Sequence, residues 1–263
     1  MSSGGSSFAP AQPSGPPDVR QLRGVAVIER ALREGRALGL LLVEEGVEEE
    51  ATRRVVELAR ERGVPVRTAS AAVLRRMTSI GPPASLLALE GRDPSAGLDA
   101  VLSTGSAVWL LVGLAYPTNA GVAIRTAEGS GAGAIVIDAE WDHTARRAAL
   151  RASMRADWYM PVFWQAAEDA LSRARAAGYR LYAIENVGEV EPWDVDLRPP
   201  ALFMIGGEAH GIPEEVLARC DGVLRVPMAG FIPSYNLQIA VGVVAAEVLR
   251  QRRARPADGR TPG

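Results

Sequence analysis

Lysine is absent from this chain of 263 residues, so all 29 of its cationic side chains are arginines. This absence excludes a phosphate-binding loop of the usual kind, because that loop places a lysine on the phosphates. Any contact with an anion must instead be made by guanidinium. This group pairs bidentately with phosphate and keeps its proton at any ordinary pH.

Cysteine and histidine are scarce as well. Cys220 is the only cysteine, which excludes an internal disulfide and a cysteine-based metal site. With only His143 and His210 left, a catalytic zinc site would need carboxylates that the sequence does not group near them, so we expect no metal. No apolar run approaches the roughly 20 residues that a membrane span requires, so we expect no membrane contact.

The remaining composition is typical of a globular cytoplasmic protein. Hydrophobic residues make up 48% of the chain and the formal net charge is −2. The acidic isoelectric point, about 5.9, argues against a uniformly basic nucleic-acid binder but leaves room for a local basic patch. Residues 1–17 are rich in Ser, Gly and Pro and lack a signal-peptide pattern, which predicts a disordered tail. We expect a second flexible tail at 254–263.

Two series of alternating strand and helix patterns predict an α/β protein with two domains. The first series covers residues 18–97 and the second covers residues 106–253, with a linker expected at 98–105. Strands of the second series are nearly all apolar, as in a parallel sheet with helices on both faces. Ligands bind outside the carboxyl ends of such strands, and three unusual loops follow strands there.

Polar residues and glycines mark the first two of these loops. The first reads YPTNAGVAIR, in which Asn119 can cap a helix, Gly121 permits close backbone approach and Arg125 follows one turn later. The second reads IGGEAHGIP, in which Glu208 is bracketed by Gly206, Gly207 and Gly211. Three glycines in six residues indicate a sharply bent chain or backbone pressed against a ligand.

The third loop reads VPMAGFIPSYN and opens an apolar helix. Ser234 is expected to be the N-cap of that helix, which leaves Tyr235 and Asn236 without a structural explanation. Each loop alone is explained by capping, a salt bridge or a solvated side chain. Their coincidence after three apolar strands is what indicates a functional site.

A row of basic residues follows the second strand of this series. His143, Arg147, Arg151 and Arg155 recur every four residues, on one face of a predicted helix, with no acidic residue between 144 and 156. A solvated helix face explains such a row. Contact with a phosphodiester backbone explains it equally well.

In order and spacing, NAGVAIRTA, IGGEAHGIP and VPMAGFIPSYN resemble the three signature motifs of the SpoU/TrmH branch of the SPOUT methyltransferases. The likeness covers residues 106 to about 250, and residues 18–92 resemble the ribosomal-protein-like substrate-binding domain that often precedes it. The resemblance implies a trefoil-knotted α/β domain that holds S-adenosylmethionine in the knot. It also implies an obligate homodimer with sites at the interface, and methylation of a ribose 2′-hydroxyl in ribosomal or transfer RNA.

The resemblance also implies residue roles. The catalytic set would be Asn119, Arg125, Glu208, Ser234 and Asn236, and the cofactor contacts would be Ile205, Gly206, Gly207, Val226, Met228 and Tyr235. Arg151, flanked by Arg147 and Arg155, would contact the RNA phosphate. Because a guanidinium has a pKa above ~12, we expect Arg125 to stabilise the developing alkoxide while a phosphate or water accepts the proton.

Four aromatic residues depart from the family pattern. Tyr116 replaces an acidic residue, and Tyr235 replaces the leucine of Ser-Leu-Asn. Trp158 and Tyr159 lie in the segment after RASM, where a small Gly-Ala pair and apolar residues are usual. They motivate an alternative hypothesis, a methyltransferase of the same fold whose aromatic pocket takes a small molecule. Core packing or a dimer interface explains these side chains as well. A third hypothesis is an RNA-binding protein that has lost catalysis.

Overall fold

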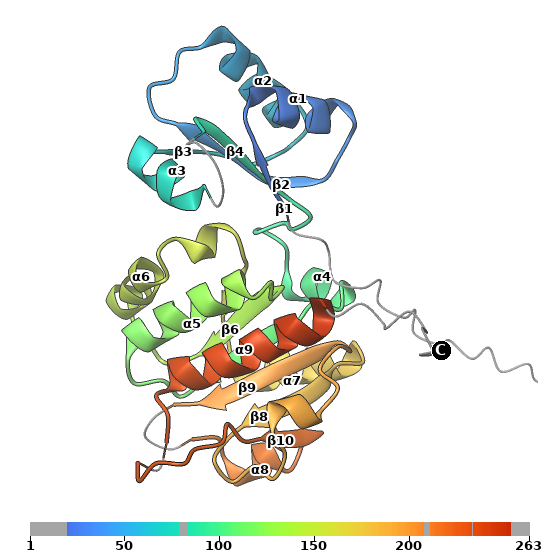
Figure 1. The fold of residues 1–263 in the computed structure, drawn as a ribbon, viewed down its shortest axis with the longest axis vertical. Coiled ribbons are helices and arrows are strands. Elements are labelled where there is room, and N and C mark those ends of the chain that lie inside the picture. Colours follow the sequence, from blue (N-terminus) through green and yellow to red (C-terminus); the bar gives the residue numbers. More distant parts are fainter. Residues whose placement is uncertain (1–19, 79–83, 208–210, 233, 254–263) are drawn as a thin grey trace, which may run out of the picture.

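The computed structural model of the chain describes residues 20–78, 84–207, 211–232 and 234–253. It shows two α/β domains, one above the other in Figure 1. We call residues 20–90 the N-terminal domain. Its elements are β1 (Arg20–Arg23), α1 (Val25–Arg33), β2 (Leu38–Glu44), α2 (Glu50–Glu61), β3 (Val66–Ala69), α3 (Ala71–Met77) and β4 (Leu86–Glu90).

The N-terminal domain is built on a four-stranded sheet in the order β1-β4-β2-β3. β2 and β3 are parallel, whereas β4 is antiparallel to both β1 and β2. Helices α1 and α2 cover one face of the sheet, with Ile28 and Val55 buried beneath them, and α3 covers part of the other face. The helices and strands that the sequence pattern indicates in this domain are all present. The additional strand β1 was not predicted, because its four residues are too short and too exposed to form an apolar pattern.

Residues 98–253 form the C-terminal domain. Its elements are α4 (Leu98–Ser103), β5 (Val108–Val112), α5 (Pro117–Gly129), β6 (Ala134–Asp138), α6 (His143–Ala152), η1 (Ala156–Trp158), β7 (Val162–Trp164), α7 (Ala167–Ala176), β8 (Arg180–Ile184), η2 (Pro192–Asp194), β9 (Ala201–Gly206), α8 (Glu214–Leu217), β10 (Gly222–Leu224) and α9 (Leu237–Arg253). The six strands form one sheet in the order β10-β8-β9-β5-β6-β7, and every neighbouring pair is parallel.

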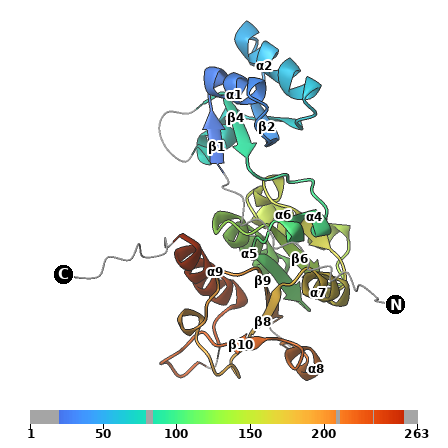
Figure 2. The same ribbon diagram turned by 90° about the vertical axis from the view of Figure 1, so that its right-hand side faces the viewer.

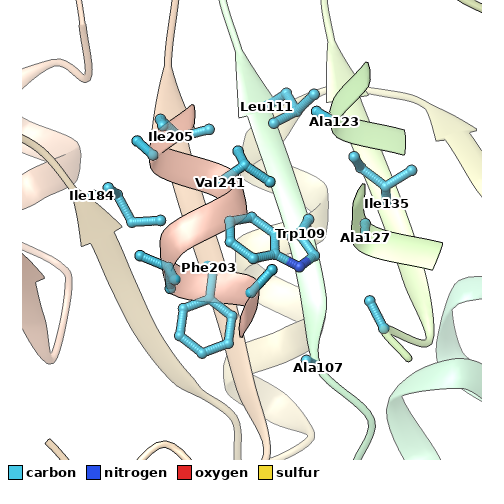
Figure 3. Close-up of a cluster of buried hydrophobic side chains, with 14 of the residues drawn as sticks. Ala107, Trp109, Leu111, Ala123, Ala127, Ile135, Ile184, Phe203, Ile205 and Val241 are labelled. Carbon is cyan, nitrogen blue, oxygen red and sulfur yellow. The ribbon is translucent and has the colours of Figure 1, made fainter. Parts of the chain in front are cut away.

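Helices cover both faces of this sheet, as the apolar strands predicted (Figure 2). On one face, Trp109 and Phe203 lie in a cluster with residues of α5, α6 and α9, including Val241 (Figure 3). On the other face, strand residues such as Leu110 and Met204 pack against α4 and α7. Successive residues of one strand therefore point to opposite faces of the sheet and enter different cores. Because both faces are buried, the strands are apolar throughout.

The segment expected to be a linker, residues 98–105, contains helix α4. Its residues Leu98, Val101 and Leu102 are buried in the core of the C-terminal domain. Composition did not reveal this helix, because its six residues are too few to show a helical period and Gly and Ser surround it. The connection between the domains is therefore shorter than expected and lies before residue 98.

Helices α5 and α6 pack unusually closely at Gly121. A Cβ atom at this position would overlap the carbonyl oxygen of Ala149 and the side chain of Ala152. The sequence predicted that backbone could approach Gly121 closely, and the segment that does so is helix α6. It places the arginines of α6 beside Arg125 of α5.

The two domains share an apolar contact. Trp158 and Tyr159, just before β7, pack against a cluster on the N-terminal sheet that includes Leu40, Leu42 and Leu87. This is the sheet face that α3 covers only in part. The C-terminal domain therefore completes the second core layer of the N-terminal domain.

None of the described helices is both long and apolar enough to cross a membrane.

Replacing Gly121 by Ala should destabilise the protein by about 1–3 kcal/mol, because α6 must move to admit the new methyl group. Chemical denaturation with urea measures this change as a lower midpoint. Gly129→Ala is the matched control on the same helix, since a Cβ added there would have nothing within 4 Å of it, and it should be neutral or stabilising by up to about 1 kcal/mol. Equal midpoints for the two variants would contradict this account of the α5–α6 contact.

Candidate functional site

A cavity of about 280 Å³ lies at the carboxyl ends of β8 and β9. Three stretches of chain line it: the end of β8, the glycine loop after β9, and the entrance to α9. The lining residues are Ile184, Glu185, Asn186, Ile205, Gly206, Gly207, Gly211, Val226, Ser234, Tyr235, Leu237 and Ala240. The second and third of the unusual loops thus meet at the edge of the sheet where ligands bind in such folds.

The two described ends of the glycine loop, Gly206–Gly207 and Gly211, lie in close contact. Gly207 donates a hydrogen bond to the carbonyl of Val112 at 2.7 Å, and Gly211 donates to the carbonyl of Gly207 at 3.0 Å. A Cβ atom at Gly207 would overlap the carbonyl oxygen of Gly113, and one at Gly206 would overlap Gly211. The sharply bent chain predicted for this loop is confirmed, and its glycines bring three backbone segments together at the cavity wall.

The entrance to α9 corrects the predicted cap. The helix begins at Leu237, and the side-chain oxygen of Asn236 accepts a hydrogen bond from the backbone N–H of Gln238 at 3.0 Å. Asn236 is therefore the capping residue, and the prediction of Ser234 as N-cap is wrong. Ser234 lies two residues before the cap and is one of the residues that line the cavity. Tyr235 also lines the cavity, and its hydroxyl donates to the carbonyl of Pro227 at 3.4 Å.

Sequence reasoning missed the contribution of the β8 end. Glu185 lines the cavity and its carboxylate accepts a hydrogen bond from the backbone N–H of Ile212 at 2.9 Å, which ties the β8 end to the glycine loop. Asn186 follows it in the lining. The signal available in the sequence was position alone, since a carboxylate and an amide directly follow an apolar parallel strand.

Other residues expected at the cofactor divide into two groups. Ile205 and Val226 are buried and line the cavity, whereas Met228 is half-buried and is not in its lining. Glu208, the acidic residue of the predicted catalytic set, lies outside the described residues.

A second, larger cavity of about 1030 Å³ lies between the two domains. Eight arginines line it: Arg20, Arg76, Arg92, Arg125, Arg147, Arg151, Arg155 and Arg253. Its acidic lining residues are Glu128 and Asp157. Although the isoelectric point of the whole chain is acidic, a local basic patch is therefore present, and it lines a concave surface.

The basic row of α6 is only partly helical. The helix ends at Ala152, and Met154 and Arg155 have positive φ angles of 56° and 72°. The prediction that Arg155 continues the helical face is therefore wrong. The turn nevertheless directs Arg155 to the same cavity as Arg147 and Arg151, whereas His143 is not in the lining.

The N-terminus of α5 also differs from the prediction. The helix begins at Pro117 with Tyr116 in the capping position, so Asn119 lies inside the first turn and is not the cap. Arg125 lies two turns further along and lines the larger cavity, not the smaller one. Within one chain, Arg125 and Ser234 thus belong to different cavities.

The four aromatic departures do not gather in one pocket. Trp158 and Tyr159 line the larger cavity and contact the N-terminal domain, whereas Tyr235 lines the smaller one. Tyr116 is 59% exposed and lines neither. An aromatic pocket for a small molecule, as the alternative hypothesis required, is not formed by these residues.

Burial sets the electrostatics at the base of the larger cavity. The nearly buried guanidinium of Arg92 lies 3.6 Å from the Glu128 carboxylate and donates to the carbonyl of Tyr159 at 3.3 Å. Burial lowers the pKa of Arg92 and raises the pKa of Glu128. Burial, reinforced by the charge of Glu128, raises the pKa of Tyr159 to about 12, so its phenol stays protonated at neutral pH.

Among the residues that the structure describes, no three or more His, Cys, Asp and Glu side chains come together in a group that could hold a metal ion.

Comparison with known proteins matches both domains. The SpoU rRNA methylase family matches residues 106–246, and the RNA 2′-O ribose methyltransferase substrate-binding family matches residues 22–88. A 23S rRNA (guanosine-2′-O-)-methyltransferase RlmB from Xanthomonas axonopodis is 28% identical over 81% of this chain and 88% of its own length. An uncharacterised tRNA/rRNA methyltransferase from Mycobacterium ulcerans is 31% identical over 84% of this chain and 74% of its own.

Solved structures share the fold. An rRNA methyltransferase from Sinorhizobium meliloti, crystallised with S-adenosylmethionine (AdoMet) bound, superposes with a TM-score of 0.56 at 24% identity. The match covers 90% of this chain and 88% of the other. The expected fold, a parallel-sheet SPOUT domain after a small α/β domain, is thereby confirmed.

Replacing Gly207 by Ala should raise the dissociation constant for AdoMet at least about tenfold, because the new Cβ would push the glycine loop away from Gly113. Titration calorimetry measures the constant, and circular dichroism checks that the variant is folded. Gly230→Ala is the matched control, because a Cβ at that position would meet nothing within 4 Å. A folded Gly207→Ala protein that binds AdoMet as tightly as the control would show that the loop does not hold this ligand.

Proposed function

Because the chain belongs to the SpoU rRNA methylase family, we propose that it transfers the methyl group of AdoMet to a ribose 2′-hydroxyl of ribosomal or transfer RNA. The observation that carries this proposal is the smaller cavity, which two of the three family motifs build at the carboxyl edge of the parallel sheet. The N-terminal domain, which matches an RNA substrate-binding family, would recruit the RNA.

The smaller cavity has the chemistry to hold AdoMet. Ile205, Val226 and Leu237 offer apolar surface to an adenine ring, and the backbone of Gly206, Gly207 and Gly211 can approach a ligand closely because no side chain stands in the way. The Glu185 carboxylate and the Ser234 hydroxyl supply polar partners. When bound, AdoMet supplies an electrophilic methyl group on a positively charged sulfur.

Arg125 is the residue that we assign to the ribose oxygen. The hydroxyl must lose its proton as it is methylated. A guanidinium cannot accept that proton, because it is already protonated and does not release its own proton at neutral pH. Arg125 would stabilise the negative charge that develops on the oxygen, while a phosphate or water takes the proton. Asn119, Glu208 and Ser234 would complete the site, and Asn236 would hold it in place by capping α9.

Arg147, Arg151 and Arg155 are proposed to bind the RNA backbone. All three line the larger cavity together with Arg125, so phosphates held there would bring the neighbouring ribose to Arg125. Arg155 is held by its contact with the Trp158 ring, with its guanidinium carbon 4.4 Å from the ring centroid.

We also propose that the protein is a homodimer whose sites lie at the interface. Phe231, Ile232 and Ile239 expose large apolar side chains beside the entrance to α9, and Val122 exposes another on α5. Such a surface is typical of a protein contact. Because Arg125 and Ser234 line different cavities in one chain, a partner subunit that brings its own Arg125 to the smaller cavity would complete the site. We expect the polypeptide after β9 to form the trefoil knot that the family motifs imply.

Sedimentation velocity should give a particle of about twice the chain mass of 27.9 kDa. Ile239→Glu should lower the fraction of dimer, because it would bury an unpaired carboxylate in the contact. The control is Val27→Glu, at an exposed apolar residue on α1 of the N-terminal domain and away from the smaller cavity, which should leave the mass unchanged. A monomer at all concentrations tested would refute the dimer.

Incubation with methyl-labelled AdoMet and total RNA should transfer label to RNA, and the labelled linkage should resist alkaline hydrolysis because a methylated 2′-oxygen cannot attack its phosphate. Arg125→Gln should lower the transfer rate about 10²–10³-fold, which is typical for loss of one group that stabilises a developing oxyanion. Its affinity for AdoMet, measured by calorimetry, should stay within about twofold because the proposed partner of Arg125 is the ribose oxygen of the RNA and not AdoMet.

Arg60→Gln is the control for this substitution, because Arg60 is exposed on α2 and lines neither described cavity. Label that is released by alkali would indicate methylation elsewhere than the ribose oxygen. Transfer by Arg125→Gln at the rate of the control would remove Arg125 from the mechanism.

A further inference from the structure

We propose that the larger cavity, between the two domains, binds a single-stranded segment of the RNA, with arginines of both domains neutralising its phosphates at once. This inference rests on the proposed RNA substrate. It adds a site that neither domain contains alone, because the lining combines residues of the N-terminal sheet and α3 with residues of α5, α6 and the end of α9.

Charge is the first argument. Eight arginines and two acidic residues line the cavity in a chain whose net charge is −2, so positive charge is concentrated there. Arg20 and Arg76 come from the N-terminal domain, Arg147 and Arg151 come from α6, and Arg253 comes from the end of α9. A concave surface with one sign of charge focuses the field and attracts a polyanion.

A buried cation at the base of the cavity is the second argument. Arg92 is 8% exposed, and its Nε atom has no hydrogen-bond partner among the described residues. The Glu128 carboxylate stands 3.6 Å away and is itself partly buried. The hydroxyl of Tyr159, in the same lining, also has no partner in the described part of the chain. Both atoms are themselves buried, so the charge of Arg92 adds to the positive field of the cavity from beneath its surface.

The walls of the cavity are held in place by the domain contact. Trp158 lies against the apolar face of the N-terminal sheet, and its ring is contacted by guanidinium groups from both domains, Arg67 at 5.3 Å and Arg155 at 4.4 Å. Leu40 and Leu87 complete the apolar floor. A contact of this kind keeps the two sets of arginines at a constant separation, so the binding surface needs little ordering when RNA arrives.

Size favours a single strand over a duplex. The volume of about 1030 Å³ is at the upper end for small-ligand pockets, which suffices for a short run of nucleotides and not for a double helix. The arginines of the lining can hold the backbone of such a segment. RNA recognition also depends chiefly on single-stranded loops and ends, whose bases are accessible.

The test compares two double variants of the full-length protein. Arg20→Gln with Arg76→Gln removes two exposed cations from the N-terminal wall of the cavity. Arg54→Gln with Arg60→Gln removes two exposed arginines from α2, which packs on the opposite face of the same sheet. The probes are a short labelled oligouridine and a labelled RNA duplex of the same length, and fluorescence anisotropy measures binding between about 50 and 200 mM salt.

For the cavity variant we expect oligouridine affinity to fall about tenfold near 100 mM salt, and the slope of log K against log salt to become shallower by about one to two. The control variant should match the unmodified protein on both measures, and duplex affinity should change less than oligouridine affinity. Equal binding by the cavity variant and the control would overturn the proposal. An equal loss for duplex and single strand would overturn the single-stranded assignment.

Methyl transfer to total RNA by the unmodified protein separates this inference from the proposed function. Transfer to RNA together with unchanged oligouridine binding by the cavity variant would refute the inter-domain site and leave the function standing. Absence of transfer to any RNA would refute the function itself.

Discussion

The six-stranded parallel sheet is the constraint on which the rest of the molecule depends. Its strands are buried on both faces, so they must be apolar throughout, and polar chemistry can be placed only where strands end. Because all six strands run in one direction, their carboxyl ends share one edge. The glycine loop, the β8 end and the entrance to α9 meet there for that reason.

Contact between the domains adds a second level of organisation. Trp158 and Tyr159 lie in a segment where the family usually has small and apolar residues, and they cover the part of a sheet face that α3 leaves open. The same contact buries Arg92 and Glu128, where desolvation lowers the pKa of the guanidinium and raises that of the carboxyl. Two of the four aromatic residues that suggested a small-molecule pocket therefore serve to join the domains, and the space beside them is lined with arginine.

Much of the candidate site could be predicted from the sequence, because motif residues in loops after apolar strands reach the same sheet edge whatever the details of packing. Helix starts were harder to place. Asn236, not Ser234, caps α9, and Asn119 lies inside α5, because the first residue of a helix depends on how the preceding loop packs. Arg155 left the helical row where the chain adopts two positive φ angles, and Glu185 carried no motif at all.

The sequence by itself determined the α/β class, nearly all of the strands and helices, and the family motifs, because these depend on local periodicity and on residue types at set spacings. Only the tertiary structure decided that Arg125 and Ser234 line different cavities, and that arginines from both domains converge on one of them. Those facts depend on contacts between residues far apart in the chain, such as Trp158 with Leu40 or Gly121 with Ala149. No local pattern encodes such pairings, since each side chain is equally compatible with several neighbours until the elements are packed.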